Sequence, residues 1–90
     1  MREVVIEEEG TSLAEARGWV VLKLAGGGKN GKPDRVYLRS GVAMFIEYKA
    51  PKQPLKPLQE YWRKVLVGLG FDHHTVDSIE QIREVMESYG

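Results

Sequence analysis

The chain has 90 residues, no cysteine, and 13 basic residues against 13 acidic ones. This length allows one domain over residues 1–90, with a small core that association with a partner would support. Hydrophobic residues make up 42% and charged residues 29% of the chain, which indicates a soluble globular domain rather than a disordered one. The lack of cysteine excludes disulfides, zinc–thiolate sites and thiol nucleophiles.

No apolar run approaches the length of a membrane span, and the N-terminal segment is acidic, which is the reverse of a signal peptide. We therefore expect a cytoplasmic protein with no membrane partner.

The first predicted element is a helix over residues 3–17, with Ile6 and Leu13 along one side. Residues 4–6 are β-branched, and the Gly-Thr-Ser segment at residues 10–12 is poor helix material. Ser12 with Glu15 would make a capping box, so a shorter helix starting near Ser12 is the alternative. Gly18 ends the helix in either case.

A strand and a hairpin are predicted next. Residues 19–24 read as a strand, residues 25–32 as a glycine-rich loop, and residues 34–39 and 42–49 as two strands joined by a tight turn. Residues 44–46 form a continuous apolar run, which predicts a strand buried on both faces.

A proline-punctuated connection over residues 51–57 leads to a second helix that begins at Pro57 and ends at Gly70. Its predicted apolar stripe is Leu58, Trp62, Val65 and Leu69, supported by Tyr61 and Leu66. Residues 71–76 read as a fourth strand. Asp77 and Glu80 are expected to cap a last helix, whose inner face carries Ile79, Ile82 and Met86.

Acidic and basic residues stand in the sequence where the predicted hairpin begins and where it ends, and these two points lie together in space. Side chains alternate along a strand, so Glu47 and Lys49 project from one face and Tyr48 from the other. The hairpin can bring Asp34 beside Glu47. Two carboxylates suit a hard cation such as Mg²⁺ or Mn²⁺, and Lys49 can orient an attacking water and offset charge on a phosphate. The alternative is a surface pair of Glu47 and Lys49 without a function.

Basic residues bracket this site in the sequence. Residues 23–39 and residues 49–64 each carry five basic residues and one acidic residue, and the compensating acid lies near the two ends of the chain. We expect DNA phosphates to be contacted by Lys23, Lys29, Lys32, Arg35, Lys52 and Lys56. The alternative is that mixed charges merely solvate the surface.

Three other patterns do not predict sites. Residues 26–32 fit the phosphate-binding loop, but Pro33 follows where Ser or Thr is needed and no helix begins there, so we expect no nucleotide cofactor. His73 and His74 face opposite sides of a strand and cannot share one metal. Tyr61 and Trp62 could stack on bases, but the position of Trp62 on the apolar stripe favours a core role.

The element order α-β-β-β-α-β-α with these motifs resembles the PD-(D/E)XK nuclease superfamily. The resemblance implies an α/β (α+β) fold with a restriction-endonuclease-like core, in which helices flank a mixed central sheet. Residues 30–35 (NGKPDR), 45–51 (FIEYKAP) and 57–59 (PLQ) are similar, within that superfamily, to the virus-type replication-repair nuclease (VRR-NUC) domain. The resemblance covers about residues 3–88.

The resemblance implies that Asp34 and Glu47 are metal ligands and that Lys49 is the catalytic lysine. Gln59 would position the site or the substrate. A glutamate of the N-terminal helix also belongs to the family pattern; Glu7 is favoured here, and its neighbours Glu8 and Glu9 are the alternatives.

Short members of this family are structure-specific endonucleases that cut branched DNA, notably four-way (Holliday) junctions. We therefore expect a Mg²⁺- or Mn²⁺-dependent endodeoxyribonuclease. The alternatives are a nuclease that nicks flaps, ends or other forms, and a catalytically silent DNA-binding module. Two cuts on a two-fold-symmetric junction need two sites, so a homodimer is expected, with the last helix or the first helix as its interface.

Overall fold

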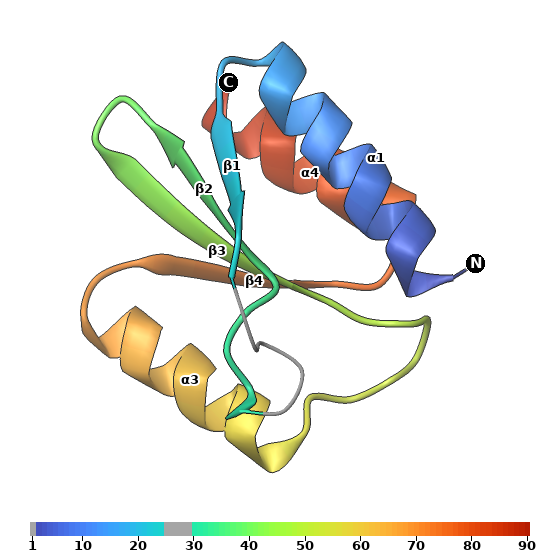
Figure 1. The fold of residues 1–90 in the computed structure, drawn as a ribbon, viewed down its shortest axis with the longest axis vertical. Helices are drawn as coiled ribbons and strands as arrows, with labels where there is room; N and C mark the ends of the chain where they lie inside the picture. The colour runs from blue at the N-terminus through green and yellow to red at the C-terminus, as the bar shows by residue number, and fades with distance from the viewer. Residues whose placement is uncertain (1, 25–29) are drawn as a thin grey trace.

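The computed structural model describes residues 2–24 and 30–90. Its elements are, in chain order, α1 (Glu3–Ala16), β1 (Val20–Lys23), β2 (Arg35–Arg39), β3 (Val42–Tyr48), α3 (Pro57–Gly68), β4 (Asp72–Val76) and α4 (Ile79–Tyr89) (Figure 1). This is the predicted order α-β-β-β-α-β-α. Most of the predicted glycine-rich loop, including Lys29, lies outside the described residues.

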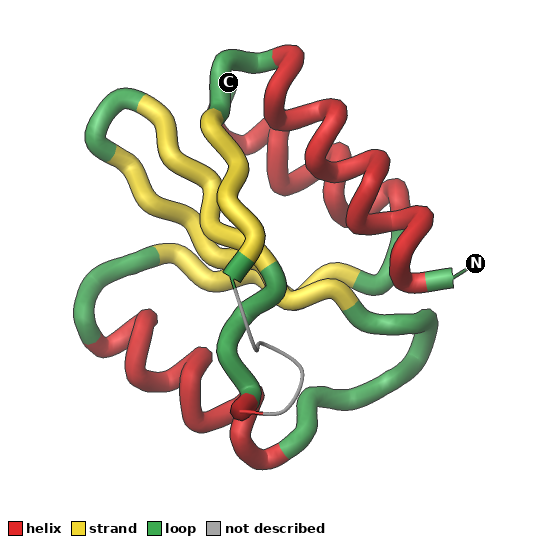
Figure 2. The backbone as a smooth tube through the Cα atoms, viewed as in Figure 1, coloured by secondary structure: helices red, strands yellow, loops and turns green. Residues whose placement is uncertain are grey.

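The strands form one mixed sheet in the order β1-β2-β3-β4 (Figure 2). The pairs β1–β2 and β2–β3 are antiparallel, and β3–β4 is parallel. The β2–β3 hairpin turns through Ser40 and Gly41, both at positive φ (47° and 79°), which is the backbone of a tight two-residue turn matched to the twist of the strands. The predicted α+β architecture with a mixed central sheet is confirmed.

Helices α1 and α4 cover one face of the sheet, and α3 lies on the other (Figure 1). The core is between the sheet and the α1–α4 pair. Its fully buried large side chains are Ile6, Tyr37, Met44, Ile46, Tyr48, Val76, Ile82 and Met86. None of the described helices combines the length and the apolar character needed to cross a membrane.

Strand β3 is less symmetrically buried than its apolar run predicts. Met44 and Ile46 are completely buried toward α1 and α4. Phe45 points to the opposite face, where it is only partly covered and meets the ring of Phe71 edge-on at 5.7 Å. The prediction of burial on both faces is wrong at Phe45, because α3 packs against β4 and leaves much of that face open.

Of the apolar residues predicted for the inner side of α3, only Leu66 is buried. Leu58 is 54% exposed and Leu69 is 68% exposed, whereas the helix buries Gln59 and Leu66. Trp62 is not a core residue either: it is half-buried, and its indole N–H donates to the carbonyl of Asn30 at 3.0 Å. The prediction assumed that the most apolar side of the helix faces the sheet.

Helix α1 runs without a break through residues 10–12, so the alternative start near Ser12 is wrong. Gly10 is buried at the contact with Tyr48 and Ile82. A Cβ at position 10 would overlap the Tyr48 hydroxyl and lie 2.9 Å from Ile82 Cγ1. The glycine that weakens the helix is therefore required for its close approach to the sheet.

Helix α4 begins at a different cap from the one predicted. Ser78 Oγ accepts a hydrogen bond from the Gln81 N–H at 3.1 Å, and Gln81 Oε1 accepts from the Asp77 N–H at 2.7 Å. The Ser78 hydroxyl and the Gln81 side-chain amide thus form the cap of α4. This pair lies one residue later in the sequence than the predicted pair of Asp77 and Glu80.

The inner face of α4 is not available as a subunit interface. Ile82 and Met86 are fully buried inside the protomer, and Ile79 packs against the same core. The prediction that these residues could join two subunits is wrong, because the core of one protomer already uses them.

We predict that Gly10→Ala lowers the free energy of unfolding by about 1–3 kcal/mol, because the added methyl group overpacks the contact with Tyr48. Gly68→Ala in α3 is the matched control: its Cβ meets no atom within 4 Å. It should be neutral or stabilise the protein by up to about 1 kcal/mol. Urea unfolding of both variants tests this, and equal effects of the two substitutions would contradict the packing role of Gly10.

Candidate active site

The site forms where β3 leaves the sheet. Glu47 and Lys49 lie on the α3 face and are only 4% and 8% exposed, whereas Tyr48 between them points into the core and is fully buried. This is the alternation that the sequence predicts. Isolated charges at such depth are costly, so their surroundings must supply partners.

Asp34 lies beside this strand end. Its backbone N–H donates to the Ile46 carbonyl at 3.2 Å, which extends the β2–β3 pairing by one bond. Its carboxylate accepts the backbone N–H of Tyr48 at 2.7 Å. The carboxyl groups of Asp34 and Glu47 are close enough to share a hydrogen bond. The predicted juxtaposition of the two acids is therefore present.

Burial raises the pKa of both carboxyl groups. For Glu47, loss of solvent is the largest cause and the charge of Asp34 is the next, and together they raise the pKa from 4.5 to about 8, although the Lys49 ammonium opposes the shift. For Asp34, burial raises the pKa, while the hydrogen bond from the Tyr48 N–H acts in the opposite direction. One proton is thus retained near neutral pH, as expected for two close acids.

Gln59 links the charged groups of the site to α3. Its Nε2 donates to Glu47 Oε2 at 3.1 Å, and its Oε1 accepts from Lys49 Nζ at 3.3 Å. The same oxygen accepts the backbone N–H of Lys56 at 2.8 Å, which caps the start of α3. One amide therefore fixes the acid, the lysine and the helix relative to one another.

Glu7 is the glutamate of α1 that reaches this region. Its carboxylate binds Arg35 Nε at 2.7 Å, and its charge acts on Asp34. Glu8 is exposed, and Glu9 pairs with Arg83 of α4 at 3.6 Å. The carboxylate of Glu7 is therefore bound by Arg35, and its charge helps to raise the pKa of Asp34.

The basic residues predicted to contact DNA differ in their surroundings. Lys23, Lys52 and Lys56 are exposed. Arg35 is occupied by Glu7, and the Lys32 ammonium lies 5.8 Å from the centre of the Trp62 ring. Their contact with DNA stays a prediction.

The two histidines do not meet. His74 Nε2 contacts the Tyr89 hydroxyl at 2.9 Å, on the α4 side of β4. His73 faces the α3 side, and burial, with the nearby Arg63 charge, lowers its pKa to about 4. Within residues 2–24 and 30–90 there is no group of three or more His, Cys, Asp and Glu side chains that could hold a metal.

Two features of the site were not found in the sequence. The backbone N–H of Tyr48 holds Asp34, and a main-chain donor leaves no residue-type signal. The hydroxyl of Tyr48 is 2.5 Å from that of Tyr37 in the core, which fixes the strand on its other face. Two tyrosines on adjacent strands were the available signal for that contact.

The sequence matches no protein-family model and no curated protein. The structure is similar to a solved structure described as a VRR_NUC domain, with a TM-score of 0.86 and 28% sequence identity. The match covers 98% of this chain and 97% of the other, so the likeness extends over both domains from end to end.

The resemblance predicted from residues 30–35, 45–51 and 57–59 is thereby confirmed, and so is the fold that it implied. In its fold, its element order and its sequence, this chain is similar to the solved VRR_NUC domain over essentially its whole length.

Proposed function

We propose that this chain is a metal-dependent endonuclease that hydrolyses phosphodiester bonds in branched DNA. The observation that supports this most is the adjacency of two acids, the half-buried Asp34 and the buried Glu47, beside the buried amine of Lys49. A site for structure alone would gain nothing from two carboxyl groups that repel each other. The likeness to a nuclease domain supports the same activity.

The acids fit a divalent metal ion. Two neighbouring carboxylates that hold one proton between them at neutral pH would lose that proton to solvent when a cation binds. Asp34 and Glu47 would hold Mg²⁺ or Mn²⁺ and leave its other positions to water and phosphate, as Mg²⁺ prefers. When bound, such an ion supplies charge stabilisation to the phosphate and the leaving oxygen.

Lys49 and Gln59 act on the water and the phosphate. Gln59 Oε1 holds the Lys49 ammonium on the same face as Glu47. A fixed, buried ammonium can orient an attacking water and stabilise the growing negative charge on the phosphate without reorganisation. Glu7 keeps Arg35 in place next to Asp34, so it supports the site through that arginine.

Branched DNA, and four-way junctions in particular, is the substrate that we favour, and two chains would supply the two cuts. The exposed lysines Lys23, Lys52 and Lys56 would contact its phosphates. A nuclease that makes single nicks at flaps or ends is the second candidate. A silent DNA-binding module is disfavoured because Asp34, Glu47 and Lys49 are all present and adjacent.

The raised pKa of Glu47 predicts the pH dependence of stability. Well below pH 4.5 the Glu47 carboxyl is protonated in both the folded and the unfolded protein. Between pH 4.5 and about 8 the unfolded chain loses this proton and the metal-free folded protein keeps it, so folding is progressively destabilised as pH rises. Glu47→Gln should remove this loss and be more stable at pH 8 by a few kcal/mol, of the order of 1.4 kcal/mol per pKa unit.

Urea unfolding at pH 4, 6 and 8 without metal measures this difference. The exposed Glu8→Gln is the control and should follow the parent protein. Addition of Mg²⁺ at pH 8 should stabilise the parent and leave Glu47→Gln unchanged. If the free energy of unfolding of the parent and that of Glu47→Gln change in the same way with pH, burial does not raise the pKa of the Glu47 carboxyl.

Asp34→Asn or Glu47→Gln should each reduce cleavage by a factor of about 10³ or more, because each removes a carboxylate that would hold the divalent cation at the reacting phosphate. Binding of DNA should be retained or strengthened, since a negative charge is lost. The assay uses labelled four-way, flap and linear DNA with Mg²⁺, Mn²⁺ or chelator, with the exposed Glu84→Gln as control. Full cleavage by either variant would remove the proposed site, and equal cleavage of all three substrates would remove the branch preference.

Lys49→Met should keep the fold and DNA binding while kcat falls by about 10²–10³, the usual loss for one preorganised group. Methionine preserves the volume of the buried stem, and Gln59 Oε1 keeps its bond to the Lys56 N–H. Lys56→Met, an exposed change, is the control. If Lys49→Met instead unfolds at room temperature, the lysine is a structural partner of Glu47.

A further inference from the structure

The segment of chain that leads into Asp34 is attached to α3 rather than to the sheet. Asp34 itself still pairs with the sheet: its N–H donates to the Ile46 carbonyl at 3.2 Å, and its carbonyl accepts from the Leu24 N–H at 3.0 Å. Within the described part of the chain, no backbone hydrogen bond ties residues 30–33 to the sheet. Whatever holds these four residues therefore also steadies the end of the strand that carries Asp34.

The first contact of this segment is a glycine that packs against the backbone of α3. Gly31 is buried, and a Cβ at this position would lie 2.5 Å from the carbonyl carbon and 2.7 Å from the carbonyl oxygen of Leu58. The obstacle is main chain, which cannot turn aside as a side chain can. Gly31 also has a φ of 77°, where residues with a Cβ are unfavourable. Glycine is therefore required for the segment to lie this close to the first turn of α3 (Figure 1).

The second contact is the indole of Trp62, one turn further along α3. Its Nε1–H donates to the Asn30 carbonyl at 3.0 Å. The Lys32 ammonium lies 5.8 Å from the centre of the same ring, within the range of cation–π attraction. Asn30 and Lys32 flank Gly31 in the sequence, so the indole and the glycine fix the same short stretch of chain to α3.

The connection from these contacts to Asp34 is short and stiff. Only Lys32 and Pro33 lie between Gly31 and Asp34. Pro33 is buried, and its ring holds φ at about −65°. A displacement of Gly31 relative to α3 is therefore passed on to Asp34 instead of being absorbed by the chain between them.

The same end of α3 also holds the second acid of the site. Gln59, which follows Leu58 in the sequence, donates to Glu47 and accepts from Lys49. Helix α3 thus holds Glu47 through the Gln59 amide and Asp34 through residues 30–33. The relative position of the two carboxyl groups depends on this helix as well as on the β2–β3 hairpin.

We propose that Gly31 and Trp62 are positioning residues that set the place of the Asp34 carboxylate relative to that of Glu47, and with it the affinity for a divalent cation. The part that concerns the cation rests on the proposed function, whereas the positioning of Asp34 is a property of the metal-free protein. Neither residue touches the reacting groups. Removing a partner that orients a metal ligand commonly weakens metal binding by about 10–100-fold.

Trp62→Phe tests the indole contact, because it removes the N–H donor and keeps an aromatic ring. We expect it to weaken Mn²⁺ binding by about 10-fold, as followed by electron paramagnetic resonance of the free ion. Cleavage at limiting Mn²⁺ should fall with it, and excess Mn²⁺ should restore it. Trp19→Phe is the matched control: Trp19 is 3% exposed in the core, and its Nε1–H has no hydrogen-bond partner among the described residues. The control should lose stability and keep the Mn²⁺ affinity of the parent.

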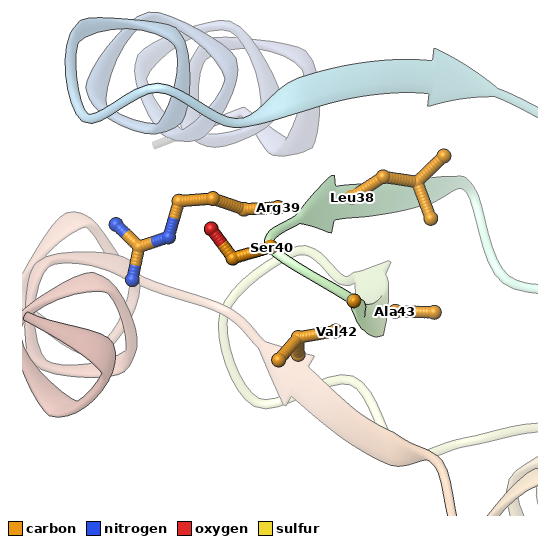
Figure 3. Close-up of a pocket in the computed structure, with 6 residues that line it drawn as sticks. Leu38, Arg39, Ser40, Val42 and Ala43 are labelled. Carbon is orange, nitrogen blue, oxygen red and sulfur yellow. The ribbon is translucent and has the colours of Figure 1, made fainter.

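Gly31→Ala tests the glycine contact and should likewise weaken Mn²⁺ binding by about 10-fold or more. Gly41→Ala is the matched control, because Gly41 has nearly the same φ, 79°, and a Cβ there meets no atom within 4 Å. Gly41 lies at the other end of the hairpin, in the turn between Ser40 and Val42, beside an open hollow of about 380 Å³ (Figure 3). Both alanines strain the backbone, but only Gly31→Ala should change Mn²⁺ affinity.

The amide proton of Tyr48 reports the position of Asp34 without any metal. This N–H donates to the Asp34 carboxylate at 2.7 Å, and a bond to a charged acceptor moves an amide proton resonance downfield. In the metal-free protein, Trp62→Phe and Gly31→Ala should shift this resonance toward its position in Asp34→Ala. Trp19→Phe and Gly41→Ala should leave it where the parent has it.

The outcomes separate this inference from the proposed function. If the parent takes up no Mn²⁺ but the Tyr48 resonance moves in Trp62→Phe and Gly31→Ala, the positioning stands and the metal site does not. An unmoved resonance with unchanged Mn²⁺ affinity in both variants would overturn the positioning, and so would equal losses of affinity in the two controls. If Gly31→Ala does not fold, Trp62→Phe alone decides.

Discussion

The position of Tyr48 is the constraint on which the rest of this structure depends. Its ring and hydroxyl are held in the core by Tyr37 and by the space that Gly10 leaves. Because side chains alternate, this anchor forces Glu47 and Lys49 onto the opposite face, at the end of the sheet. Its backbone N–H then holds Asp34. A packing contact on one face thus sets the geometry of the charges on the other.

The charged groups are tolerated at that depth because they are linked to one another. Gln59 satisfies Glu47 and Lys49 and at the same time caps α3, so the helix begins where the site needs an amide. The pKa of Glu47 still lies near 8, which means that the metal-free arrangement is strained. A protein that retains such an acid gives up stability for a function, as binding and catalytic sites commonly do.

The sequence predicts the order of elements and the three central site residues, because each depends on local rules. Strand alternation places Glu47 and Lys49 together, and the hairpin returns Asp34 to them. The rules fail where tertiary packing decides. Gly10 predicts a weak helix and instead permits a close contact, while α3 turns Gln59 rather than Leu58 toward the sheet. A polar residue that bonds to a buried acid can outweigh an apolar stripe, and periodicity alone does not detect that.

The two faces of the sheet also differ in how far the helices cover them, which again depends on tertiary packing. Helices α1 and α4 fill one face, whereas α3 packs mainly against β4 on the other and reaches β3 at Glu47, and Val20 and Leu22 on β1 stay exposed. The face that carries the buried charges of the site is therefore also the face with free apolar surface.

The claim that Asp34 and Glu47 form a divalent-cation site is tested most directly by titrating Mn²⁺ into the metal-free protein at pH 8 and following free Mn²⁺ by electron paramagnetic resonance. The account predicts that the parent protein removes the free-ion signal and that the Asp34→Asn, Glu47→Gln double variant, though folded, does not. Equal uptake of Mn²⁺ by the two proteins, or none by the parent with DNA present, would contradict it.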